Sequence, residues 1–196
     1  MKVCVIGTGY VGLVSGVCFA EIGNTVFCVD KDKDKIKLLK AGKVPIFEEG
    51  LVELIKKNME SGNLIFHSDT GSGIKESDII FICVGTPPLP SGKPDLSAID
   101  EVAKLIGRNL NSYKIILNKS TVPIGTAKRI KKIQKKVIRY FTLWGLIVKP
   151  SKKRIGDFLN EVRLLSYKEF KDLFPDCKIY KEKFMGFSKS FIAIKK

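Results

Sequence analysis

Along the first two-thirds of the chain, short apolar runs alternate with segments whose apolar residues recur at helical spacing. The apolar runs have the length and composition of strands buried on both faces, and they lie at 2–7, 25–30, 63–68, 78–85 and 113–120. The predicted helices lie at 10–23, 33–42, 48–62, 95–110 and 125–136. Strands separated by helices of this length predict βαβ units, and therefore an α/β fold with a doubly wound, mostly parallel sheet.

After residue 136 the pattern changes. Residues 167–174 read as a helix stopped by Pro175, and two alternating segments, 177–184 and 189–196, read as a strand pair. We therefore predict two parts: a domain at 1–136 and a short α+β tail at 137–196.

Charge separates the same two parts. The 196 residues are 44% hydrophobic and 28% charged, which is typical of a globular protein and excludes a disordered one. Residues 1–130 carry 17 Lys and Arg against 14 Asp and Glu, whereas residues 131–196 carry 18 against 6. The net charge of +15 therefore belongs mainly to the tail and does not by itself make the protein a nucleic-acid binder.

The basic run at 128–140 is the one candidate for such binding. Ile130, Ile133 and Val137 form an apolar stripe at helical spacing, which favours a packed helix with a solvated basic face. A phosphate or nucleic-acid patch and a membrane-surface helix remain alternatives.

The five cysteines form no C-x-x-C pair, and we interpret four of them, those in apolar runs, as buried thiols of a reducing compartment; they are Cys4, Cys18, Cys28 and Cys83. His67 has no metal-ligand neighbours and is interpreted as structural, so no metal site is expected. No apolar run reaches the roughly 18 residues of a membrane span, and we expect a cytoplasmic protein.

A glycine motif, Gly7-Thr-Gly9-Tyr-Val-Gly12, follows the first strand and opens the first helix. This context is typical of a Rossmann-type dinucleotide site, in which the diphosphate lies against the helix N-terminus. Asp30 ends the second strand, where a carboxylate binds the adenosine ribose and repels a 2′-phosphate, so NAD is favoured over NADP. An FAD site, or a simple glycine turn with Asp30 capping a helix, remains an alternative.

Two further turns place threonine beside proline at strand ends. Thr86 lies in 84–88 and Thr121 in 118–126, both at the edge of the sheet where ligands bind in open α/β folds. We interpret both hydroxyls as ligand-binding groups; helix capping is the alternative.

Residues 1–133, with the motifs "VGTPP" and "NKSTVPIGT", resemble the NAD-binding domain of the UDP-glucose/GDP-mannose dehydrogenase family. The resemblance implies that the glycine turn binds the NAD diphosphate, with Tyr10 and Val11 giving backbone contacts. It also implies that Lys35 lies near the adenosine, that Thr86 contacts the cofactor, and that Thr121 lies beside the nicotinamide and helps to hold the reacting water.

The family oxidises the C6 alcohol of a nucleotide sugar to a carboxylate with two NAD, through a cysteine thioester formed further along the chain. No motif of that second half is found here, and Cys177 lacks its sequence context. We therefore expect a truncated, inactive enzyme that would use a UDP-sugar only if the missing half were supplied; a non-catalytic dinucleotide-binding module is the alternative. The tail weakly resembles the C-terminal end of class I S-adenosylmethionine-dependent methyltransferases. This resemblance implies that the tail is a remnant of a second gene, joined to the first by a gene fusion or a frameshift. Oligomeric state is not predicted.

Overall fold

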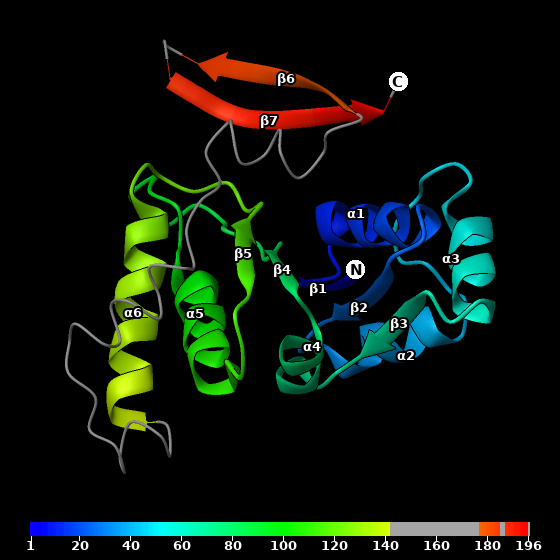
Figure 1. Ribbon diagram of the computed structural model, residues 1–196, viewed down its shortest axis with the longest axis horizontal. Coiled ribbons are helices and arrows are strands. Elements are labelled where there is room, and N and C mark those ends of the chain that lie inside the picture. The colour runs from blue at the N-terminus through cyan, green and yellow to red at the C-terminus, as the bar shows by residue number, and fades with distance from the viewer. Residues whose placement is uncertain (142–176, 185–186, 196) are drawn as a thin grey trace. The chain divides into compact units, whose positions relative to one another are not determined.

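A five-stranded parallel sheet forms the centre of the first unit of the chain. The computed structural model describes residues 1–141, 177–184 and 187–195, and the chain divides into two compact units, Met1–Val162 and Arg163–Lys196. The strands of the first unit are β1 (Lys2–Ile6), β2 (Thr25–Val29), β3 (Leu64–His67), β4 (Ile79–Ile82) and β5 (Ile115–Asn118). They lie in the order β3-β2-β1-β4-β5, each parallel to its neighbour (Figure 1). The predicted doubly wound α/β sheet is confirmed.

Helices pack on both faces of this sheet. They are α1 (Tyr10–Glu21), α2 (Lys33–Lys40), α3 (Leu51–Glu60), α4 (Thr70–Glu76), α5 (Ser97–Asn109) and α6 (Thr126–Phe141). One buried core joins α1, α2 and α3 to the sheet through residues such as Leu13, Leu39 and Ile55. The other core joins α4, α5 and α6 through residues such as Ile74 and Ile106. Among the described helices, α1, α2 and α3 thus cover one face and α4, α5 and α6 the other, which is consistent with right-handed crossovers from a central strand.

The sheet register brings the carboxyl ends of the strands to one edge. Ile6 pairs with Val29 on one side and with Ile82 on the other, and Ile82 pairs with Asn118. The chain first builds outward from β1 through β2 to β3, then returns to place β4 and β5 on the other side (Figure 1). The strand order therefore reverses at β1, and the turns after β1, β2, β4 and β5 all lie at this edge.

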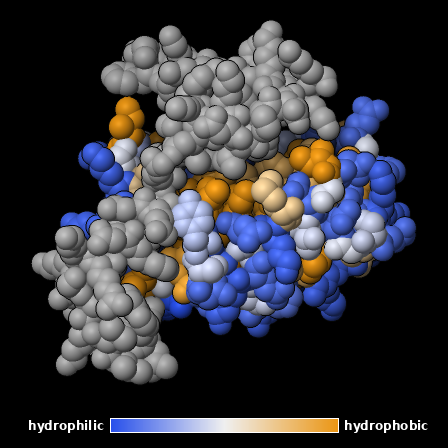
Figure 2. All heavy atoms as spheres, in the orientation of Figure 1, coloured by the Kyte–Doolittle hydropathy of each residue, from blue (hydrophilic) through white to orange (hydrophobic). Residues whose placement is uncertain are grey.

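Hydrophobic residues are exposed at the same edge. Figure 2 shows a largely hydrophilic face on which hydrophobic residues gather toward the side where β4 and β5 end. Tyr10 and Val11 after β1 are about half exposed, and Ile124 after β5 is fully exposed. Such apolar surface is available for contact with a bound molecule or another segment of protein.

Helix α6 packs along α5, as Figure 1 also shows. Ile130 and Val137 are buried, so the predicted apolar stripe of this basic helix is confirmed. The close approach occurs at Gly107 of α5, where an added Cβ would lie 3.2 Å from the Val137 side chain. Because α6 continues to Phe141, the predicted boundary at residue 136 falls inside a helix; the division into 1–136 and 137–196 stays a prediction.

In the second unit, β6 (Cys177–Phe184) and β7 (Phe187–Lys195) form an antiparallel pair, which confirms the strand pair predicted for the tail. The predicted helix at 167–174 lies outside the described residues. None of the helices in the described part of the chain has the length and hydrophobicity of a membrane span.

The prediction for the cysteines was wrong at one position. Cys4, Cys28 and Cys83 are buried, but Cys18 is exposed. The buried residues of α1 include Leu13, Val17 and Ala20, and Cys18 falls on the opposite side of the helix. An apolar run that forms a helix necessarily turns some of its residues to solvent.

Candidate cofactor-binding site

The glycine turn between β1 and α1 is packed against the end of β4. Gly7 has φ 100°, a left-handed conformation that favours glycine, and its amide donates to the Val29 carbonyl at 2.8 Å. A Cβ on Gly7 would lie 2.7 Å from the Cys83 carbonyl oxygen, and one on Gly12 would lie 1.8 Å from the Gly7 carbonyl oxygen. Two of the three motif glycines are therefore required by the close approach of β1, β4 and α1.

Gly9 has a different role, because its missing side chain leaves space. An added Cβ there would meet no atom within 4 Å among the described residues, and Gly9 has ordinary extended backbone angles, φ −71° and ψ −174°. Gly9 is also the N-cap of α1, and no described side chain hydrogen-bonds to this helix start. Uncapped amides and the positive end of the helix dipole, next to open space, fit a diphosphate.

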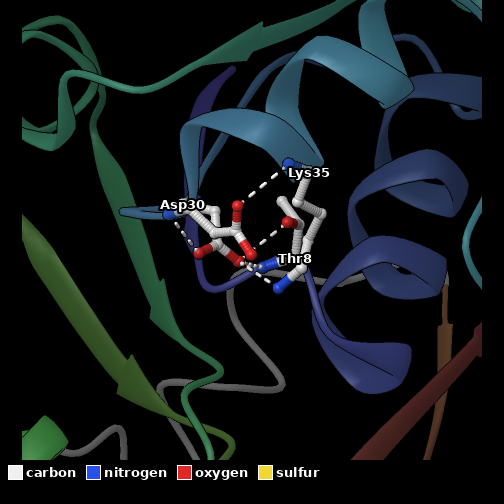
Figure 3. A network of polar contacts seen from close by, with 4 residues as sticks. Thr8, Asp30 and Lys35 are labelled. Atoms are coloured by element: carbon white, nitrogen blue, oxygen red, sulfur yellow. Dashed lines mark hydrogen bonds and ion pairs between the residues drawn. The ribbon is translucent and has the colours of Figure 1, made fainter.

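Asp30 follows β2 and lies beside this turn. Its Oδ2 accepts hydrogen bonds from the Thr8 amide and the Thr8 hydroxyl, both at 2.8 Å, and pairs with the Lys35 ammonium at 3.2 Å (Figure 3). Its Oδ1 accepts from the Asp32 amide at 3.1 Å. Desolvation raises the pKa of Asp30, but the hydrogen bonds from Thr8, Asp32 and Lys35 outweigh it and hold the pKa below its ordinary value. The carboxylate is therefore ionised at neutral pH and fixed in orientation.

Thr8 is the member of this group that the sequence did not reveal. It is the variable residue between the first two glycines, yet only 1% of it is exposed, and both its amide and its hydroxyl bind Asp30. The alternative that Asp30 caps a helix is wrong, because Asp32 is the N-cap of α2 and accepts from the Lys35 amide. The sequence signal that could have identified Thr8 is its side-chain hydroxyl. A polar side chain in this turn, which is buried next to the Asp30 carboxylate, needs a hydrogen-bond partner.

The two threonine turns come together at the ends of β4 and β5. The Thr86 hydroxyl donates to the Thr121 carbonyl oxygen at 2.8 Å. Neither threonine caps a helix, because the N-cap of α5 is Leu96 and α6 begins at Thr126, so the capping alternative is wrong. The predicted site residues thus form two groups on either side of β1: the glycine turn with Asp30 and Lys35, and the two threonines.

The arrangement defines a Rossmann-type nucleotide-binding domain, with a dinucleotide site at the edge where the strand order reverses. Comparison with known proteins makes the class more specific. The sequence profile described as "UDP-glucose/GDP-mannose dehydrogenase family, NAD binding domain" matches residues 1–163. The chain belongs to this family and is an NAD-binding domain.

Named relatives agree with this assignment. The chain is 48% identical over 160 residues to UDP-glucose 6-dehydrogenase TuaD of Bacillus subtilis, covering 82% of the chain and 35% of the relative. It is 48% identical over 134 residues to UDP-glucose 6-dehydrogenase of Rhizobium meliloti, covering 68% and 31%. The chain therefore spans about a third of the length of these relatives.

Solved structures show the same partial coverage. A UDP-glucose dehydrogenase from Pyrobaculum islandicum matches with a TM-score of 0.66 and 34% identity, covering 69% of this chain and 32% of that one. A ternary complex of GDP-mannose dehydrogenase from Pseudomonas aeruginosa matches with a TM-score of 0.68 and 27% identity, covering 83% and 44%. The profile match continues to residue 163, beyond the end of the resemblance predicted at residue 133. These matches give no support to the methyltransferase resemblance of the tail.

Proposed function

We propose that this chain holds NAD for a UDP-glucose 6-dehydrogenase-like oxidoreductase, which oxidises the C6 alcohol of UDP-glucose to the carboxylate of UDP-glucuronate with two NAD. In this proposal the diphosphate lies on the amides of Tyr10 and Val11, above Gly9. Asp30 accepts hydrogen bonds from the adenosine ribose, with Lys35 beside it. The bound NAD supplies the hydride acceptor; the chain's own residues bind and orient it.

The observation that carries the proposal is the fixed, ionised carboxylate of Asp30 next to an uncapped helix start. Three hydrogen-bond donors already hold its Oδ2, so its orientation costs nothing further when a ribose binds. A 2′-phosphate at the same place would meet a negative charge that cannot turn away. NAD should therefore bind and NADP should bind at least about tenfold more weakly.

Calorimetric titration with NAD tests the cofactor site. Asp30→Ala should weaken NAD binding by about tenfold or more, because a charge-assisted hydrogen bond to a ribose hydroxyl contributes roughly 1.5–3 kcal/mol. Asp34→Ala is the matched control, since Asp34 is an exposed carboxylate in the first turn of α2 and its loss changes the net charge equally. Equal affinities of the two variants, or no NAD binding by the wild type, would refute the proposal.

The second candidate is a dinucleotide-binding module without turnover. Its support is that the chain spans about a third of the length of its relatives, and that Cys4, Cys28 and Cys83 are buried thiols in the core. We propose that the chain alone binds NAD but does not oxidise UDP-glucose. Incubation with both compounds, followed at the NADH absorbance, separates the candidates, and sustained NADH production by the chain alone would exclude the second.

We further propose that a UDP-sugar is a substrate only together with the rest of such an enzyme. We also propose that the basic face of α6 is a solvated surface rather than a nucleic-acid site. The buried thiols favour a reducing compartment such as the cytoplasm.

A further inference from the structure

The turns after β4 and β5 are cross-linked by two hydroxyls that point in opposite directions. The Ser120 hydroxyl, on the β5 side, donates to the Val84 carbonyl oxygen at 2.7 Å. The Thr86 hydroxyl, on the β4 side, donates to the Thr121 carbonyl oxygen at 2.8 Å. Each turn thus supplies one donor and one acceptor, and neither turn can shift without breaking a bond.

Ser120 is the centre of this connection. Its amide donates to the Ile82 carbonyl at 3.2 Å, its hydroxyl binds Val84, and its own carbonyl accepts from the Asn118 side-chain amide at 3.0 Å. Its backbone amide and carbonyl and its hydroxyl are therefore all engaged. The β4–β5 ladder ends at Ile82 and Asn118, and the Lys119 and Ser120 amides still donate to the Ile82 carbonyl. Beyond Ile82 the two hydroxyl hydrogen bonds join the segments.

The position of these turns relates them to one half of the cofactor. Asp30 lies at the end of β2, on one side of β1, and the helix start suited to the diphosphate follows β1 itself. A dinucleotide that has its adenosine at β2 and its diphosphate at β1 must extend in the other direction, over β4 and then β5. The cross-linked turns therefore lie on the side of the nicotinamide half.

We propose that Ser120 is a positioning residue for the nicotinamide half of NAD. Its hydroxyl fixes the separation between the turn that carries Thr86 and the turn that carries Thr121, so that both are pre-oriented before NAD binds. Without this bond the turns would have to be ordered during binding, and the cost would appear as lost affinity. The inference rests on the proposed function, in which NAD occupies this edge.

The test compares two ligands that differ only by the nicotinamide, NAD and ADP-ribose, in calorimetric titrations of Ser120→Ala. The NAD affinity should fall by about five- to tenfold, the range that corresponds to one lost hydrogen bond. The ADP-ribose affinity should stay within about twofold of the wild type, because the groups around Asp30 are untouched. Retained ADP-ribose binding also demonstrates that the variant is folded.

Ser77→Ala is the matched control. Ser77 is a buried serine at the opposite end of β4, and its hydroxyl likewise donates to a backbone carbonyl, that of Ile74 at 3.3 Å. It should reduce thermal stability without changing either affinity. If Ser120→Ala fails to fold, Asn118→Ala, which releases the same turn through the Ser120 carbonyl, should give the same loss confined to NAD.

Three results would overturn the inference: equal losses for NAD and ADP-ribose, no loss for either, or a wild type that binds NAD no better than ADP-ribose. The first would make Ser120 merely structural, the second would show that its hydroxyl does not order the turns, and the third would show that the nicotinamide adds nothing to binding at this edge. A wild type that binds neither ligand would instead refute the proposed function. The two failures are therefore distinguishable.

Discussion

Two of the motif glycines should respond to the same substitution in opposite ways. Gly9→Ala adds a methyl group that meets no protein atom within 4 Å among the described residues, whereas Gly12→Ala adds one 1.8 Å from the Gly7 carbonyl oxygen and 3.0 Å from the Cys83 Cβ. The first methyl fills space proposed for a diphosphate, and the second collides with the backbone. We therefore expect Gly9→Ala to weaken NAD binding in a folded protein and Gly12→Ala to destabilise the fold.

The magnitudes follow from these contacts. At Gly9 the backbone angles suit alanine. Alanine reduces the conformational entropy of the unfolded chain, which favours folding by about 0.4–1 kcal/mol, but it is a poorer N-cap than glycine. These two effects offset each other, so the free energy of unfolding should change by less than about 1 kcal/mol. At Gly12 the clash is with the backbone of Gly7, whose amide is hydrogen-bonded to Val29 of β2. Overpacking of this kind costs typically about 1–3 kcal/mol, and we expect the upper end of that range. The melting temperature should then fall by roughly 10 °C.

Circular dichroism during urea and thermal unfolding measures stability, and calorimetry with NAD measures binding. Gly9→Ala should lose at least about tenfold in NAD affinity, equivalent to about 1.4 kcal/mol, while its unfolding midpoint stays near that of the wild type. Undiminished NAD binding by Gly9→Ala would show that the turn does not hold the diphosphate. A Gly12→Ala variant as stable as the wild type would disprove the close approach of α1 to β1.

Two further predictions concern buried groups away from the site. Lys114 is 1% exposed, and its ammonium donates hydrogen bonds to two backbone carbonyls. Lys114→Met should therefore lower the free energy of unfolding in urea by about 1–3 kcal/mol. The control Lys128→Met, at an exposed lysine, should lower it little. Burial raises the pKa of the Cys83 thiol to about 11 and also raises the pKa of Cys28. At pH 8 an alkylating reagent should therefore modify the exposed Cys18 before Cys28 and Cys83, as peptide mass spectrometry would detect. Equal losses for the two lysine variants, or equal labelling of the thiols, would contradict these predictions.

How much the sequence predicted depended on how local the determining contacts are. The five strands and the glycine turn were predicted because each is encoded in a continuous run with a clear period or motif. Helix α4 was missed, because Thr70–Glu76 is only seven residues long, contains two glycines and has one clearly apolar residue, Ile74. Its N-terminus depends on Asp69, whose side chain accepts from the Gly71 amide, and on Ile74 packing into a core assembled from distant strands.

The same distinction separates the two halves of the candidate site. The adenosine side is built from residues close in sequence, with Thr8 and Asp30 one βαβ unit apart, so the motif and its carboxylate were recognisable from spacing. The side of Thr86 and Thr121 depends on hydrogen bonds between residues about 35 apart, in two turns that meet only after the sheet has formed. The sequence alone placed both threonines at the edge of the sheet. It could not show that the Thr86 hydroxyl donates its hydrogen bond to the turn that carries Thr121.

This asymmetry has a physical consequence for the function of the chain. The side-chain hydrogen bonds of the proposed adenosine side lie within residues 7–35, whereas those of the other side join the turns after β4 and β5, so the two groups share no hydrogen-bond partner. Substitutions in the turns should then change what the nicotinamide adds to affinity while the adenosine side keeps its own contribution, because sites without shared partners contribute additively. Both groups of predicted site residues lie within the described part of Met1–Val162, so the proposed function makes NAD binding a property of this unit by itself. Among the described residues of the unit, Cys18 is the one exposed thiol, and for this reason we expect NAD binding without sugar oxidation.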